Sequence, residues 1–318
     1  MIKVDLITGF LGAGKTTFLL KYAKYLMSQG LKIGILVYDH GAVNVDMPFL
    51  KELRGEQCEL EMLAGACDAD CHRRRFRTKL ISMGMSGYER VIIEPSGVFD
   101  VDEYFDTLNE SPLDRWYEAG SVITVVDAKL GENYTEEEDF FLASQAASAG
   151  CILLSRVQLA TAEDIEKTVL HLEKAEKRIH CSLPVRSCVL SKDWADLTEE
   201  DFAGLMNCGC RHPDYVKTIA GRELEFQSLS FLNPEMTRDE LKKKITELFR
   251  DRKYGNIIRV KGFFDEGGRW YQVNATEGEV RIEKAPESRG AIIVIGSGLN
   301  EENISILMTG KPPEHRIL

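Results

Sequence analysis

Residues 9 to 16 read Gly9-Phe10-Leu11-Gly12-Ala13-Gly14-Lys15-Thr16, which matches every fixed position of the pattern G-x-x-x-x-G-K-[ST]. An apolar run from Val4 to Ile7 precedes the stretch and indicates a buried strand, and residues 17–26 have the spacing of an amphipathic helix. Glycines between such a strand and helix let backbone N–H groups converge on phosphate at the positive end of the helix. The stretch therefore predicts an α/β domain that holds a nucleoside triphosphate.

The side chains of this loop suit a magnesium nucleotide. Lys15 is expected to neutralise the β- and γ-phosphates and to stabilise the charge that develops during hydrolysis. The Thr16 hydroxyl is expected to ligate Mg²⁺. The loop residues predicted to bind the nucleotide are Gly12, Ala13, Gly14, Lys15, Thr16 and Thr17.

A second phosphate-site element is expected where the buried run Arg90–Ile93 ends in Glu94-Pro95-Ser96-Gly97. Glu94 is predicted to hold Mg²⁺ through water or to orient the attacking water, and the Gly97 N–H to sense the γ-phosphate. The alternative for Glu94 is an acid that caps a turn. Asp39 and Asp46 flank a loop after another buried run, and Asp46 is the predicted Mg²⁺ ligand, with turn formation as the alternative.

Composition excludes several classes of protein. The 318-residue chain has a formal net charge of −11, which disfavours extended nucleic-acid binding because that needs a basic face. No apolar run approaches the roughly 20 residues that span a bilayer, and the chain enters a core strand directly, so no membrane association and a cytoplasmic location are expected. In that compartment the eight cysteines are predicted to be thiols or metal ligands instead of disulfides.

A change in the hydrophobic pattern predicts two domains. Over residues 1–212, short apolar runs alternate with helical patterns, which indicates a mostly parallel sheet covered by helices on both faces. Over residues 213–318, apolar and polar residues alternate, which indicates a smaller α+β domain with an antiparallel sheet. The helix starts indicated by paired capping residues are Thr161 with Asp164 and Thr237 with Glu240.

Several stretches together carry a family resemblance. The run Ile7–Thr17, the segment Glu94–Gly97 and, beyond the first domain, Tyr254–Phe264 and Ile292–Gly296 are similar to the CobW-like branch of the CobW/HypB/UreG group of P-loop GTPases. The resemblance covers nearly the whole chain. It implies a slow GTPase in which the GTP state controls contact between the protein, its metal and a client.

The resemblance also implies where the base is recognised. Family members recognise guanine through an N-K-x-D motif after a buried strand, and the corresponding segment here is Ser155-Arg156-Val157-Gln158. Arg156 is expected to stack beneath a purine as the family lysine does. Gln158 offers one neutral acceptor where the family aspartate accepts two charge-assisted bonds, so weak discrimination between GTP and ATP is predicted.

A first candidate metal site lies where family members commonly carry a C-x-C-C motif. Here the region reads Gly65-Ala66-Cys67-Asp68-Ala69-Asp70-Cys71-His72, and Cys67, Cys71 and His72 offer ligands for Zn²⁺ or Co²⁺. On a helix, Cys67 and Cys71 would share a face, whereas a loop would let all three bind one metal. The alternative is ordinary semi-buried thiols.

A second candidate metal site is the segment Cys208-Gly209-Cys210-Arg211-His212. Its C-x-C-x-H spacing in a glycine-containing loop suits chelation of Zn²⁺ or Co²⁺ by Cys208, Cys210 and His212. The alternative is a pair of partly exposed reduced cysteines.

The leading hypothesis is a Mg²⁺-dependent nucleoside triphosphatase switch that assists a metal-dependent or corrinoid-dependent client enzyme. Arg73 to Arg75 offer an arginine finger in a homodimer, with surface pairing as the alternative. A second hypothesis is a nucleotide-responsive binding module with little hydrolysis. A third is an ATP-driven activator in which Cys67 and Cys71 of two subunits share an iron–sulfur cluster.

Overall fold

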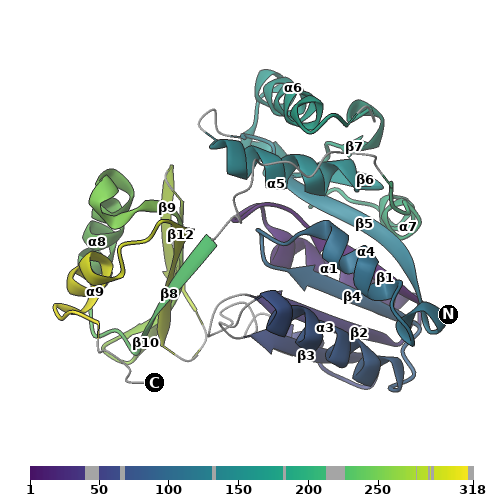
Figure 1. The fold of residues 1–318 in the computed structure, drawn as a ribbon, viewed down its shortest axis with the longest axis horizontal. Helices are drawn as coiled ribbons and strands as arrows, with labels where there is room; N and C mark the ends of the chain where they lie inside the picture. Colours follow the sequence, from purple (N-terminus) through teal and green to yellow (C-terminus); the bar gives the residue numbers. More distant parts are fainter. Residues whose placement is uncertain are drawn as a thin grey trace. The chain divides into compact units, whose positions relative to one another are not determined.

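The computed structural model describes residues 1–39, 50–64, 69–130, 134–181, 184–212, 226–276, 278–285, 287 and 290–313. The chain divides into two compact units, of which the first holds the elements up to α7 and the second those from β8 onward (Figure 1). The predicted boundary between residues 212 and 213 adjoins a segment outside the described residues.

The first unit contains a seven-stranded sheet in the order β3-β2-β4-β1-β5-β6-β7. Every pairing from β2 to β7 along this order is parallel, which confirms the predicted α/β class. Its strands are β1 (Ile2–Thr8), β2 (Ile33–Asp39), β3 (Cys58–Ala64), β4 (Arg90–Pro95), β5 (Tyr117–Asp127), β6 (Cys151–Ser155) and β7 (Val189–Leu190).

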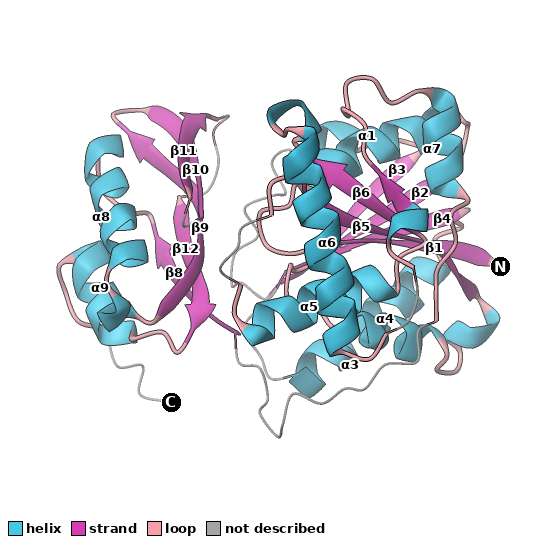
Figure 2. Ribbon diagram, turned by 90° about the horizontal axis from the view of Figure 1, so that it is seen from above, coloured by secondary structure: helices cyan, strands magenta, loops and turns pink. Residues whose placement is uncertain are grey.

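Helices cover both faces of this sheet. Figure 2 shows α1 and α7 on one face and the helices α3 to α6 on the other. The α-helices are α1 (Lys15–Ser28), α3 (Ala69–Gly84), α4 (Val101–Leu108), α5 (Glu136–Ala147), α6 (Ala162–Arg178) and α7 (Glu199–Met206). Single 3₁₀ turns are η1 (Lys51–Leu53), η2 (Leu113–Arg115), η3 (Val157–Leu159) and η4 (Arg186–Cys188).

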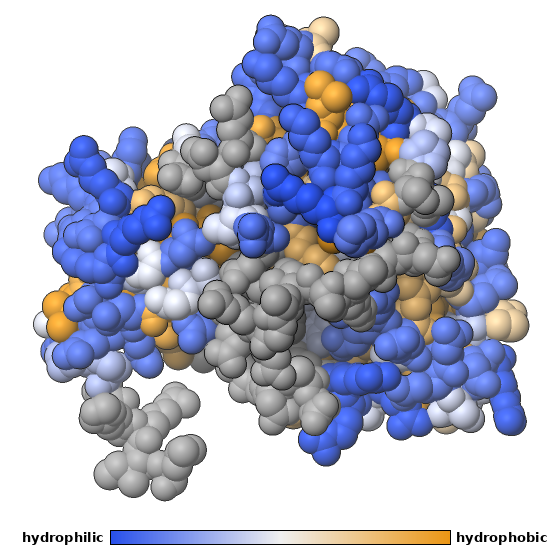
Figure 3. Space-filling view, turned by 45° about the horizontal axis from the view of Figure 1, so that its top comes forward, coloured by the Kyte–Doolittle hydropathy of each residue, from blue (hydrophilic) through white to orange (hydrophobic). Residues whose placement is uncertain are grey.

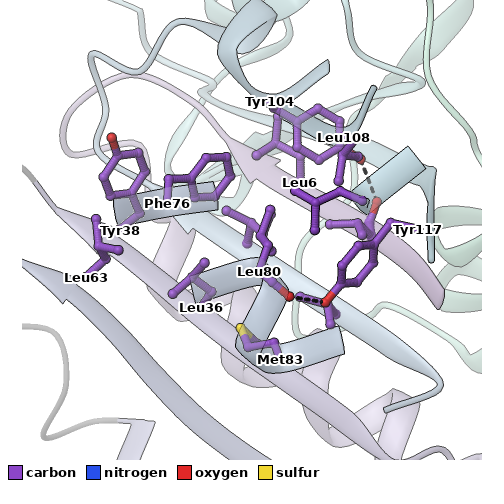
Figure 4. Packing of buried hydrophobic residues seen from close by; sticks show 14 of the residues in the cluster. Leu6, Leu36, Tyr38, Leu63, Phe76, Leu80, Met83, Tyr104, Leu108 and Tyr117 are labelled. Carbon is purple, nitrogen blue, oxygen red and sulfur yellow. Dashed lines mark hydrogen bonds between the residues drawn. The ribbon is translucent and has the colours of Figure 1, made fainter. Parts of the chain in front are cut away.

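One apolar side of the strands packs in the core beneath α3 and α4. Leu6 of β1 and Leu36 of β2 pack there against Phe76 and Leu80 of α3 (Figure 4). The Tyr117 hydroxyl donates to the Leu80 carbonyl oxygen at 2.8 Å, so the polar end of a buried ring is also satisfied. Packing on two faces explains the continuous apolar runs seen in the sequence.

The second unit is an antiparallel sheet of five strands in the order β11-β10-β9-β12-β8. Helices α8 and α9 lie on one face, where Leu241 and Ile304 join the core (Figure 2). This confirms the predicted α+β arrangement. Its elements are β8 (Phe226–Leu232), α8 (Arg238–Arg250), the 3₁₀ turn η5 (Arg252–Tyr254), β9 (Asn256–Glu266), β10 (Arg269–Thr276), β11 (Glu279–Lys284), β12 (Ala291–Ser297) and α9 (Glu301–Thr309).

Helix capping follows the sequence closely. Thr161 and Asp164 form a capping box at α6, and Thr237 and Glu240 form one at α8, as predicted. The acidic run after Thr135 also begins a helix, because the Thr135 side chain accepts the Glu138 N–H and the Glu138 side chain accepts the Thr135 N–H.

The surface is that of a charged protein. Hydrophilic residues cover most of the described surface on the face that Figure 3 shows, with hydrophobic residues in small groups. Among the helices of the described ranges, none combines the length and apolar character that crossing a bilayer requires.

Candidate nucleotide-binding site

The loop between β1 and α1 adopts a conformation that requires its glycines. Gly9 and Gly14 have φ angles of 138° and 103°, which side chains rarely adopt. A Cβ atom at Gly9 would also lie 2.2 Å from the Val125 carbonyl oxygen on β5. The loop therefore packs against the neighbouring strand and passes directly into the first turn of α1.

Lys15 is buried, with 7% of its surface exposed, although it is charged. Its ammonium group donates to the Gly9 carbonyl oxygen at 2.8 Å, so the side chain folds back over the loop that precedes it. A cation at this place, together with the positive end of α1, makes the loop attractive to phosphate.

The structure brings together Thr16 and Glu94, the two described residues predicted to hold Mg²⁺. The Thr16 hydroxyl donates to the Glu94 carboxylate at 2.6 Å, although 78 positions separate them in the chain. Because β4 pairs with β1 in parallel, the carboxyl ends of both strands meet at one edge of the sheet. Asp46, the other predicted ligand, lies outside the described residues, as does the side chain of Asp39.

Gly97 lies against the phosphate-binding loop. A Cβ atom at Gly97 would be 2.5 Å from the Leu11 nitrogen, a distance that no side chain tolerates without movement of the backbone. The Gly97 carbonyl oxygen accepts a bond from the buried Gln145 side chain at 3.1 Å. The segment after Glu94 is thus held between the loop and α5.

Arg156 joins the base-side segment to the loop. It has a φ angle of 56°, forms an ion pair with Asp127 and donates to the Gly12 carbonyl oxygen at 2.9 Å. The guanidinium that is predicted to stack beneath a purine is therefore held by two contacts. Gln158 lies in η3 with an exposed side chain, at the same edge of the sheet.

Trp194 and Asp127 belong to this region, and sequence reasoning missed both. The Trp194 indole N–H donates to the Leu154 carbonyl oxygen at 2.9 Å, and its ring lies 5.6 Å from that of Phe18. A Cβ atom at Gly14 would be 3.3 Å from the same indole. The segment after the two-residue strand β7 has no motif that would predict the position of Trp194. Asp127 had a usable signal, because it is an acidic residue at the end of an apolar run, as Glu94 is.

The Cys208–His212 segment lies at the opposite end of β6 from Arg156. The bridge between Ala149 and Cys210 places it beside the amino end of that strand. The Cys210 sulfur and His212 Nε2 are 3.7 Å apart, but the Cys208 thiol faces the Val122 carbonyl oxygen at 4.0 Å. The predicted set of three ligands is therefore not brought together.

Burial affects the protonation of both thiols in this segment. It raises the pKa of Cys208 to about 11, and it also raises the pKa of Cys210. A protonated thiol is a poor ligand. Across the part of the chain that the structure describes, no three His, Cys, Asp or Glu side chains gather in a way that would hold a metal.

The first candidate metal segment is only partly described. Cys67 lies outside the described residues, as does the His72 side chain, while Cys71 is partly exposed on α3. Cys71 and His72 are neighbours in α3, so at these two positions the structure has the helical of the two arrangements considered for this segment. Arg73 pairs with Glu110 at 2.7 Å, which agrees with surface pairing in place of an arginine finger.

Family models match most of the chain. The CobW/HypB/UreG nucleotide-binding domain matches residues 3–185, and the cobalamin synthesis protein cobW C-terminal domain matches residues 226–309.

Among curated proteins, the zinc chaperone YjiA of Escherichia coli is 29% identical over 195 residues, which cover 58% of this chain and 56% of that protein. The zinc chaperone YeiR of the same organism is 26% identical over 166 residues, covering 51% and 49%. The chain thus spans about half the length of these relatives. Among solved structures, Zn(II)-bound YjiA GTPase from E. coli covers 98% of this chain and 99% of its own, with 21% identity and a TM-score of 0.36.

Proposed function

This chain belongs to the CobW/HypB/UreG family, and we propose that it acts as a magnesium-dependent GTPase switch that delivers a metal to a client enzyme. The observation that carries the proposal is the 2.6 Å contact between Thr16 and Glu94 beside a buried Lys15. Hydroxyl and carboxylate oxygens are the ligands that Mg²⁺ prefers, so these residues fit the ion. When bound, Mg²⁺ would offset the charge that develops on the phosphates.

Lys15, Glu94 and Gly97 would each have a separate role in hydrolysis. Lys15 would pair with the β- and γ-phosphates once nucleotide replaces its bond to the Gly9 carbonyl oxygen. Glu94 would orient the attacking water, because its carboxylate lies at the carboxyl end of β4 beside the loop. The Gly97 N–H would donate to the γ-phosphate from the segment that packs on Leu11.

Guanine is the proposed base, although the family aspartate is replaced by Gln158. Arg156 supports this proposal because its ion pair with Asp127 and its bond to Gly12 give the base site a fixed planar cation. Relatives are named as zinc chaperones, and one from Dictyostelium discoideum as a zinc-regulated GTPase metalloprotein activator. We therefore propose zinc as cargo, with Cys67, Cys71 and His72 as its ligands, and retain cobalt or a corrinoid as the alternative.

Direct competition of Mg-GTP and Mg-ATP for the protein tests the nucleotide assignment. We expect both to bind, with GTP preferred by less than about a hundredfold because Gln158 offers a single neutral acceptor. The Lys15→Ala variant serves as the control and should bind neither. Preference for ATP would contradict the GTPase proposal and favour an ATP-driven activator, and undiminished binding by Lys15→Ala would contradict the assignment of the loop itself. A single turnover or none, with intact binding, would instead indicate a nucleotide-responsive binding module.

A further inference from the structure

A buried amide on α5 reaches the segment that follows Glu94. Gln145 has no exposed surface, and its Nε2 donates to the Gly97 carbonyl oxygen at 3.1 Å and to the Phe99 carbonyl oxygen at 3.4 Å. The main-chain oxygen of Gln145 accepts the Thr124 hydroxyl of β5 at 2.8 Å. One residue therefore links β5, α5 and the segment after β4.

The segment that Gln145 holds is in direct contact with the phosphate-binding loop. Gly97 approaches the Leu11 backbone so closely that a Cβ atom would lie 2.5 Å from its nitrogen. The Phe99 N–H donates to the Ser96 carbonyl oxygen at 3.1 Å, which closes a turn over residues 96–99 that includes both carbonyl groups bound by Gln145. Small movements of this turn would change the direction of the Gly97 N–H relative to the loop.

The choice of an amide at this place requires a physical explanation. Within the described residues, Gln145 Oε1 is buried and accepts no hydrogen bond, which makes glutamine a costly side chain for packing alone. Its donor group, by contrast, binds two backbone carbonyls. Two bonds from one rigid group fix the position of a turn better than apolar contact does, because hydrogen bonds are directional.

We propose that Gln145 is a positioning residue that holds the Gly97 N–H ready for the terminal phosphate, so that the protein distinguishes a nucleoside triphosphate from a diphosphate. The inference rests on the proposed function, because it assumes that nucleotide occupies the loop. Gln145 touches no reacting atom and acts only through the backbone of Gly97.

The Gln145→Met variant tests this role because methionine has a similar length and no donor. We measure equilibrium binding of Mg-GDP and of a non-hydrolysable Mg-GTP analogue, together with kcat. The analogue should bind about tenfold more weakly than to wild type, as expected for a lost directional hydrogen bond, while GDP binding changes by less than about twofold. The kcat should fall, because Gly97 contacts the phosphate that is transferred to water.

Thr124→Val is the matched control, since it removes the bond to the main-chain oxygen of Gln145 and leaves the side-chain amide in place. It should lower thermal stability without changing the ratio of analogue to GDP affinity. An unchanged ratio in Gln145→Met, or an equal loss in Thr124→Val, would overturn the inference. Failure of the wild type to bind any Mg-nucleotide would contradict the proposed function instead.

A measurement on wild type avoids any problem of folding. Hydrogen–deuterium exchange should show that residues 96–99 and the α5 segment around Gln145 gain protection together with the analogue and not with GDP. Equal protection by both nucleotides would overturn the inference.

Discussion

The two ends of the parallel sheet use polar residues in opposite ways. At the carboxyl ends, Thr16, Glu94 and Arg156 come from elements far apart in the chain and meet beside one glycine-rich loop. At the amino ends, Asp5 pairs with Arg90 at 2.8 Å, where both side chains are almost fully buried. Polar groups thus converge on a loop suited to phosphate at one end and mainly satisfy each other at the other.

The segment Cys208–His212 lies at the amino ends of the strands, where polar groups mainly satisfy each other. The C-x-C-x-H spacing has suitable residue types, but the Cys208 thiol is turned toward a backbone carbonyl oxygen, and burial raises its pKa to about 11. The His212 ring packs on Phe105 with ring centroids 5.0 Å apart. Ligand chemistry therefore depends on which way the side chains point and on solvation, which spacing alone does not determine.

The largest effect is expected from a change at the carboxyl end. Glu94→Gln should lower kcat by roughly a hundredfold, because a neutral amide neither orients water as a base does nor binds Mg²⁺ as strongly. Phosphate release under saturating Mg-GTP is the measurement. Glu176→Gln, which alters a buried glutamate on α6 at the other end of the sheet, should keep at least half of the wild-type rate. Similar losses in the two variants would remove the functional difference between the ends.

A smaller effect is expected from pH at the amino end. Burial raises the pKa of Glu176 from 4.5 to about 7, even though Arg211 lies 3.7 Å away. Between about pH 4.5 and 7 the folded protein binds more protons than the unfolded chain at this site, so the free energy of unfolding should fall as pH rises. The change should be on the order of 3 kcal/mol and should level off above pH 7.

Urea denaturation at several pH values measures this contribution. Glu176→Gln should unfold with a weaker dependence on pH than wild type over the same window. Identical pH dependence in both proteins would show that the carboxyl group does not titrate in this way.

The smallest effect is expected from the cysteines at the amino end. Anaerobic titration with Zn²⁺ should give the same stoichiometry for wild type and for a Cys208→Ser, Cys210→Ser double variant, because the Cys208 thiol faces a backbone carbonyl oxygen and not the pair formed by Cys210 and His212. The matched double variant Cys67→Ala, Cys71→Ala should lose bound Zn²⁺. Loss of stoichiometry only in the serine variant would reverse the assignment of the two segments.

Features that depend on a motif or on hydrophobic periodicity could be predicted from sequence, whereas contacts of side chains outside any motif could not. The phosphate-binding loop and the capping box at Thr161 follow from short local motifs, and the parallel sheet follows from the continuous apolar runs of its strands. The contact of Gln145 with Gly97 spans 48 positions and depends on how α5 packs against the segment that follows β4. Trp194 follows a strand of only two residues, which is too short to show a hydrophobic period.

The position of Trp194 has an optical consequence. The chain contains three tryptophans, and this indole alone among them packs beside Gly14 and Phe18 at the start of α1. Trp116 instead lies near Gly84, and Trp270 is on β10 of the second unit. Indole emission responds to the polarity and charge around the ring. Binding of a phosphate group at the loop would therefore change the fluorescence of Trp194. A change in Trp194 emission on addition of nucleotide would thus measure occupancy of the loop.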